Sequence, residues 1–129
     1  MSKTAAQLVA EANAQIESVS PQDASREVSS GKALLLDIRE PVEWEQHIDG
    51  AIQVPRGLLE WAADPASSRH QAGLEPAGRV IVYCRSGTRA ALAVQTLEAL
   101  GYEDVANLDG GITAWKEAGL PVIEHHEGI

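Results

Sequence analysis

A buried strand that runs directly into a small basic turn, and then into a helix, constrains the fold of this chain more than any other feature. Residues 80–83 are β-branched and aromatic with no polar alternation, which is typical of a strand covered on both faces of a parallel sheet. Residues 90–100 carry apolar side chains at helical spacing, and Gly101 is placed to end that helix. Ligands of open α/β sheets bind beyond the carboxyl ends of the strands. The pattern therefore predicts a ligand site at Cys84, the single cysteine of the sequence.

The turn itself has the composition of an anion-binding loop. Arg85 and Arg89 flank it, and the free amides at a helix start would favour an anion, whether a thiolate or a substrate. Gly87 permits a close backbone approach that a Cβ would hinder. A lone cysteine at a strand end is by itself more often a small buried hydrophobe. With these neighbours, Cys84 is a candidate nucleophile.

Composition sets the wider frame. A length of 129 residues predicts one domain. We expect this domain at 18–129, with a short polar C-terminal tail, and a helical extension before it at 1–17. The net charge of −9 disfavours binding to nucleic acid or anionic membranes. No apolar stretch is long enough to span a bilayer, so we expect a soluble cytoplasmic protein. Residues 80–100 hold two arginines and one acid, which predicts a locally positive site.

Strand and helix signals alternate along the rest of the chain. Helices are expected at 4–16, 21–28, 42–47, 57–63 and 112–118, and strands at 33–38, 51–54 and 104–108, with Val19 in a short first strand. This alternation indicates βαβ units and an α/β fold with a mostly parallel sheet.

Four stretches together resemble the rhodanese family of sulfurtransferase domains. Cys84-Arg85-Ser86-Gly87-Thr88-Arg89 is similar to the family's active-site loop. The supporting stretches, in the family's order and spacing, are residues 36–40 with Glu43-Trp44, residues 47–51 through Val54-Pro55, and residues 108–112 with Trp115. The resemblance implies a three-layer α/β/α fold with a central, mostly parallel five-stranded sheet. Gln46 departs from the pattern, because the family often has glycine before the histidine.

The resemblance also implies a mechanism. Cys84 as thiolate would take the outer sulfur of a donor such as thiosulfate and pass it from a persulfide to a thiol or cyanide. The substrate-binding residues implied are Arg85, Ser86, Gly87, Thr88 and Arg89, with Asp37 and Arg39 in support. We expect no cofactor and no metal. The expected partners are a small anionic sulfur donor and a thiol or protein acceptor, for a monomer or weak homodimer.

Two other functions stay open. The same fold carries cysteine-dependent phosphatases and arsenate reductases, and non-catalytic rhodanese-like modules, which commonly lack the cysteine. The loop from Cys84 to Arg89 has six residues, one fewer than Cys-x5-Arg, which favours sulfur over a tetrahedral oxyanion. Several other conspicuous residues are expected to be structural: Asp37 and Arg39 as hydrogen-bonded or ion-paired groups, His47, the solvated tail Glu124-His125-His126-Glu127, and Trp44, Trp61 and Trp115 as core or pocket wall.

Overall fold

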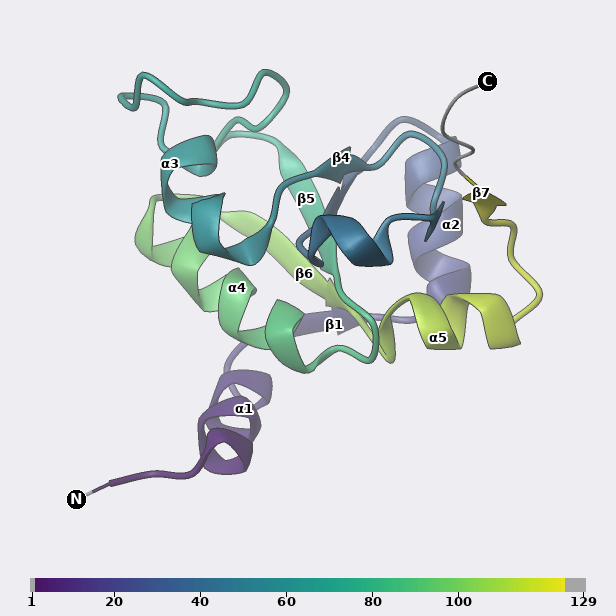
Figure 1. Cartoon of the computed structure of the whole chain (residues 1–129), viewed down its shortest axis with the longest axis horizontal. Coiled ribbons are helices and arrows are strands. Elements are labelled where there is room, and N and C mark those ends of the chain that lie inside the picture. Colours follow the sequence, from purple (N-terminus) through teal and green to yellow (C-terminus); the bar gives the residue numbers. More distant parts are fainter. Residues whose placement is uncertain (1, 125–129) are drawn as a thin grey trace.

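The computed structural model describes residues 2–124, and within them five strands form one parallel sheet in the order β1-β6-β5-β2-β4 (Figure 1). The strands of this sheet are β1 (Glu17–Val19), β2 (Leu34–Asp37), β4 (Ile52–Gln53), β5 (Arg79–Tyr83) and β6 (Asp104–Leu108). The helices are α1 (Ala5–Asn13), α2 (Pro21–Ser29), α3 (Leu59–Ala63), α4 (Thr88–Ala99) and α5 (Gly111–Glu117), with short 3-10 turns η1 (Pro41–Glu43) and η2 (Arg56–Leu58).

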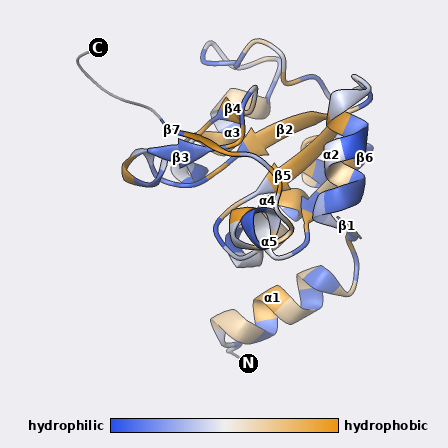
Figure 2. Cartoon of the chain, turned by 90° about the vertical axis from the view of Figure 1, so that its right-hand side faces the viewer, coloured by the Kyte–Doolittle hydropathy of each residue, from blue (hydrophilic) through white to orange (hydrophobic). Residues whose placement is uncertain are grey.

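The sheet separates two hydrophobic cores, as the alternation of side chains along a strand requires. In β5, Val80 and Val82 belong to the core beneath α3 and α4, whereas Ile81 and Tyr83 belong to the core beneath α2 and α5. Figure 1 shows α3 and α4 on one face of the sheet and α2 and α5 on the other. Figure 2 shows β2 and β5 as hydrophobic strands and hydrophilic residues on α2. The expected three-layer α/β/α fold with a central five-stranded parallel sheet is confirmed.

The helix predicted at residues 42–47 is wrong. Pro41 and the mutual capping of Glu40 and Glu43 support a single 3-10 turn, which ends at Trp44. The chain then extends into β3 (Gln46–His47), which pairs antiparallel with β7 (Ile123–Glu124). Local helical propensity was outweighed here by pairing with a segment more than seventy residues away. The other predicted helices and strands are present, with ends that differ by a few residues.

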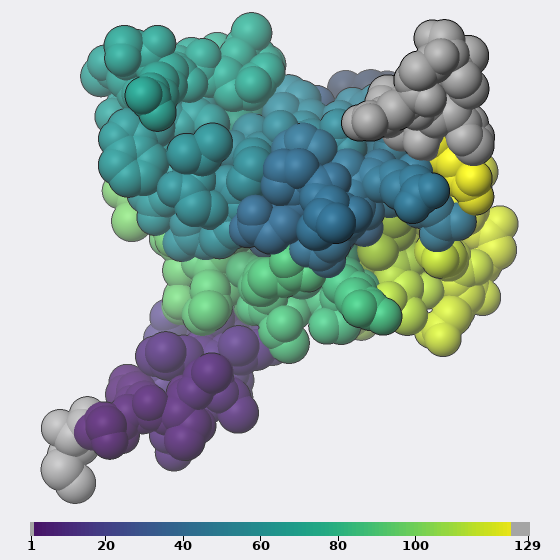
Figure 3. Space-filling view, in the orientation of Figure 1, coloured from purple at the N-terminus to yellow at the C-terminus, as the bar shows by residue number. Residues whose placement is uncertain are grey.

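The first helix lies at the side of the domain. It packs against α4 and buries Ala12 fully, and Gln95 of α4 hydrogen-bonds Gln15 at 3.3 Å. Figure 3 shows α1 projecting from the body of the molecule beneath α4. Within residues 2–124, none of the helices combines the length and the apolar character needed to cross a bilayer.

Candidate active site

The site lies at the carboxyl end of the sheet, where the central strands deliver polar residues to one edge. Asp37 ends β2, Cys84 follows β5, and Asn107 is the fourth residue of β6. The parallel register aligns these strand ends, since Asp37 is paired with Tyr83 and Asn107 with Val82. The fold therefore brings the predicted residues Asp37 and Cys84, together with Asn107, into one region.

Cys84 is fully buried, and its sulfur accepts hydrogen bonds from backbone amides. The Gly87 N–H lies 3.1 Å from Sγ, and the Ala90 N–H, in the first turn of α4, lies at 3.4 Å. Gly87 adopts φ +99°, a conformation that glycine accepts without strain and that turns the loop back over the sulfur. The side chains of Ser86 and Thr88 are exposed.

The carbonyl groups of the loop are held on its outer side. The amides of Ile112 and Thr113, at the start of α5, donate to the carbonyls of Cys84 (3.0 Å) and Arg85 (3.1 Å). The close approach depends on Gly111, because a Cβ there would lie 2.5 Å from both carbonyl oxygens. The residues Gly110-Gly111 of the fourth sequence stretch thus hold the Cys84 loop against α5.

Arg89 is committed to Glu43 of η1. Its two terminal nitrogens donate to the two carboxylate oxygens at 2.8 and 2.9 Å. This hydrogen-bonded pair lowers the pKa of Glu43 to about 2 and raises the pKa of Arg89. The expectation of a locally positive site is therefore only half right. That expectation considered only the acids within residues 80–100, whereas Glu43, which offsets the charge of Arg89, lies in the turn after β2.

Asp37 and Arg39 form a buried ion pair beside the loop. The Arg39 backbone amide and Nε donate to Oδ1 of Asp37, both at 3.0 Å, and Nη2 donates to Oδ2 at 2.9 Å. Burial opposes the charge of Arg39, but the hydrogen bond and the attraction of Asp37 outweigh it and raise the arginine pKa. The guanidinium also lies 5.6 Å from the centre of the Tyr83 ring. This geometry agrees with the structural role expected for both residues.

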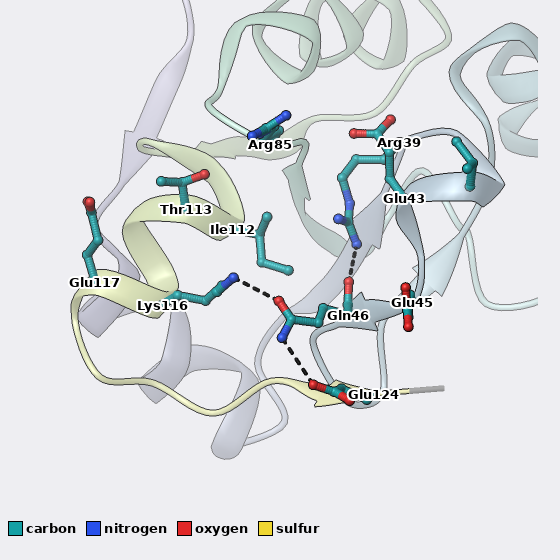
Figure 4. A pocket seen from close by; sticks show the side chains of 11 residues that line it. Arg39, Glu43, Glu45, Gln46, Arg85, Ile112, Thr113, Lys116, Glu117 and Glu124 are labelled. Carbon is teal, nitrogen blue, oxygen red and sulfur yellow. Dashed lines mark hydrogen bonds between the residues drawn. The ribbon is translucent and has the colours of Figure 1, made fainter. Parts of the chain in front are cut away.

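A cavity of about 750 Å³ opens next to the loop (Figure 4). Of the loop residues Cys84 to Arg89, Arg85 lines the cavity. Arg39 and Glu43 lie opposite it. Three other lining residues of the cavity form a hydrogen-bonded chain. Lys116 Nζ donates to Gln46 Oε1 (2.8 Å), and Gln46 Nε2 donates to Glu124 (3.3 Å). Side chains of both charges line the cavity, and its volume lies in the range of small-molecule sites.

Sequence reasoning missed four residues of this region as site residues. Glu43 and Gln46 were noted only as motif positions, and Lys116 was not singled out, although it follows Ile112 by one helical turn. Asn107 was not noted either; its signal is a lone amide in a strand of apolar residues. Among the predicted structural residues, Trp115 is buried in the core, and Trp61 is 55% exposed and lines a separate pocket.

Within residues 2–124, no group of three or more His, Cys, Asp or Glu side chains has an arrangement that could hold a metal ion. His125, His126 and Glu127 of the polar tail lie outside the described residues.

Comparison with known proteins identifies the family. The model of the rhodanese-like domain matches residues 20–118. A sulfurtransferase of Allochromatium vinosum is 38% identical over 91 residues, which cover 70% of this chain and 78% of the relative. The probable adenylyltransferase/sulfurtransferase MoeZ of Mycobacterium tuberculosis is 34% identical over 105 residues, and the match covers 80% of this chain but 25% of MoeZ. The chain thus spans only a fraction of the length of some relatives.

Solved structures agree on the fold. A Rhodopseudomonas palustris protein, described as of unknown function and a possible tyrosine phosphatase, superposes with a TM-score of 0.86 at 32% identity, covering 95% of this chain and 96% of that one.

Because the model of the rhodanese-like domain matches most of the 129-residue chain, the chain belongs to the rhodanese-like domain family.

Proposed function

We propose that the protein is a sulfurtransferase that carries a sulfane sulfur on Cys84. The observation that supports this most directly is the pair of backbone amides directed at Sγ of the only cysteine. Such donors stabilise a thiolate, and after transfer they can stabilise a persulfide in the manner of an oxyanion hole. Membership of the rhodanese-like family, and the relatives named as sulfurtransferases, support the same reaction class.

The proposed reaction has two displacements. The Cys84 thiolate attacks the outer sulfur of thiosulfate or of an organic persulfide, a new S–S bond forms, and sulfite or a thiolate leaves with the electron pair of the broken bond. An acceptor thiolate or cyanide then attacks the outer sulfur of the Cys84 persulfide and releases the Cys84 thiolate. Arg85, exposed at the cavity, is the loop cation available to an anionic donor, because Arg89 is paired with Glu43.

The test is a mass measurement on the intact protein. Brief exposure to thiosulfate should add one sulfur atom that dithiothreitol removes, and cyanide should then yield thiocyanate. The Cys84→Ser variant should add no sulfur and lose transfer by at least about a thousandfold, because no nucleophilic thiolate is left. Its thermal unfolding should stay close to that of the parent, since serine is nearly isosteric. Transfer near the parent rate in the serine variant would disprove the assignment.

A phosphatase is the second candidate, supported by the description of the Rhodopseudomonas palustris structure. The loop argues against it, because its six residues offer a smaller ring of amides than Cys-x5-Arg does. The residue before Cys84 is Tyr83, whose pKa is raised by burial and by the nearby Asp37. It is poorly placed to protonate a leaving group as an exposed acid would. Cys84-dependent hydrolysis of aryl phosphates with a kcat/KM above that of sulfur transfer would reverse the order of the two candidates.

A further inference from the structure

The Cys84 loop can stabilise a sulfur anion only if its amides point inward and its carbonyls point outward. The N–H and C=O groups of a peptide unit point in opposite directions, so turning one toward the sulfur turns the other away. An outward carbonyl buried in protein requires a hydrogen-bond donor of its own. The donors behind the loop therefore restrict the backbone conformations that the loop can adopt.

Those donors come from three elements, α5, β6 and α4. The start of α5 supplies backbone amides to the carbonyls of Cys84 and Arg85. The carbonyl of Gly87 is held by a side chain, Nδ2 of Asn107 at 3.0 Å, in addition to the Ala91 amide of α4. The held carbonyl belongs to the peptide unit after Gly87, whereas the N–H closest to Sγ belongs to the unit before it, so the tether acts on that N–H through the Gly87 backbone. Because glycine has the widest backbone freedom of any residue, its orientation depends on such a tether.

Asn107 is a polar residue in a buried position. It is 4% exposed in β6, and its neighbours Ala106 and Leu108 are apolar. Its Oδ1 is buried without a hydrogen-bond partner among the described residues. A buried amide with an unpaired oxygen destabilises the fold relative to an apolar side chain of similar shape. Its one side-chain hydrogen bond in this region is the one to Gly87, and that bond points to a role at the loop.

We propose that Asn107 is a positioning residue that holds the Gly87 carbonyl and thereby fixes the backbone conformation in which the Gly87 N–H faces Cys84 Sγ. It acts through the loop and touches neither sulfur nor substrate. The effect on sulfur transfer rests on the function proposed above. The effect on the ionisation of Cys84 does not, and it can be measured alone.

Asn107→Leu tests this directly, since leucine removes both the donor and the unpaired oxygen while keeping similar bulk. The thiolate absorbance near 240 nm reports ionisation of the single cysteine, with Cys84→Ser as the blank. We expect the titration midpoint of the variant to lie at higher pH. We also expect kcat for sulfur transfer to fall roughly tenfold or more, by analogy with the loss of an oxyanion-hole donor, while the donor KM changes less than kcat. The urea midpoint should be equal or higher.

Gln53→Leu is the matched control, because Gln53 ends β4 and also has a buried amide nitrogen without a partner among the described residues. It should leave both the titration and kcat unchanged. Asn107→Val, suited to a strand, is the second variant, with the same shift expected.

An unshifted titration and an unchanged kcat in a folded Asn107→Leu or Asn107→Val protein would overturn the proposal, as would failure of both variants to fold. If the parent protein transfers no sulfur but the titration still shifts, the proposed function fails and the positioning role stands.

Discussion

Glu43 limits the positive charge that the site can present. An isolated arginine at the end of the loop would attract an anionic donor, but Arg89 has both terminal nitrogens bonded to one carboxylate. The same carboxylate accepts the Glu40 amide at 3.0 Å, which fixes η1 against the loop. A planar guanidinium bound through two parallel hydrogen bonds is well oriented and hard to divert. The pair therefore connects the turn after β2 with the start of α4.

The Glu43–Arg89 pair should stabilise the fold in a pH-dependent way. The pKa of Glu43 is lowered to about 2, chiefly by the Arg89 hydrogen bond, so its contribution is complete above the unfolded value of about 4.3 and is lost as pH falls toward 2. Glu43→Gln should lower the unfolding free energy by about 1 kcal/mol at pH 7. That difference should shrink between pH 4 and pH 2 in urea titrations. Glu45→Gln, on the same cavity wall, is the control and should show no such difference.

At the scale of elements, α5 and the Cys84 loop approach each other closely at Gly111. Gly111 has φ +64°, and a Cβ at this position would meet two carbonyl oxygens at 2.5 Å. Neither oxygen belongs to a flexible side chain that could move aside. The start of α5 and the loop are therefore positioned as one unit.

Gly111→Ala should separate these two elements. The left-handed backbone costs about 1–2 kcal/mol for alanine, and the overlap with the carbonyls should raise the total loss of unfolding free energy to roughly 3 kcal/mol or more. Sulfur transfer should fall together with stability. Gly119→Ala is the matched control, since φ is +78° but no atom lies within 4 Å of the added Cβ. Equal losses in the two variants, measured by urea unfolding, would show that the close approach carries no energy.

The elements also show how far the sequence could predict this structure. The run of residues 80–83, the glycine loop and the helix after it were predictable because their signals are local and mutually consistent. Residues 42–47 were not, because Gln46 and His47 pair with Glu124 and Ile123. The role of Glu43 depends on a partner 46 residues away in sequence. Asn107 gave a local signal, a polar residue in an apolar strand, but its target on the loop could be identified only from the fold.

At the scale of the whole molecule, the two ends of the sheet differ in what they hold. The candidate site lies at the carboxyl end of the sheet. At the opposite end, Arg79, the first residue of β5, connects neighbouring elements. Its guanidinium bonds Glu17 of β1, Glu27 of α2 and Asp104 of β6, at 2.6–3.2 Å. The hydrogen bonds that Arg79 donates to Glu17, and then to Glu27, raise the pKa of Arg79. One side chain thus links β5 to residues 25, 52 and 62 positions away in sequence.

Arg79→Leu should therefore weaken the fold without changing the chemistry. Loss of the cation leaves three carboxylates close together, and since Arg79 is 14% exposed but its partners are 26–54% exposed, we expect a loss of about 2–3 kcal/mol. Arg26→Leu removes the exposed Arg26–Asp23 pair and should cost less than about 0.5 kcal/mol. Urea unfolding measures both. The kcat and KM of the folded Arg79→Leu protein should equal those of the parent, because the site lies at the other end of the strands. A fall in kcat at a temperature where the variant is folded would instead show that the two ends of the sheet are coupled.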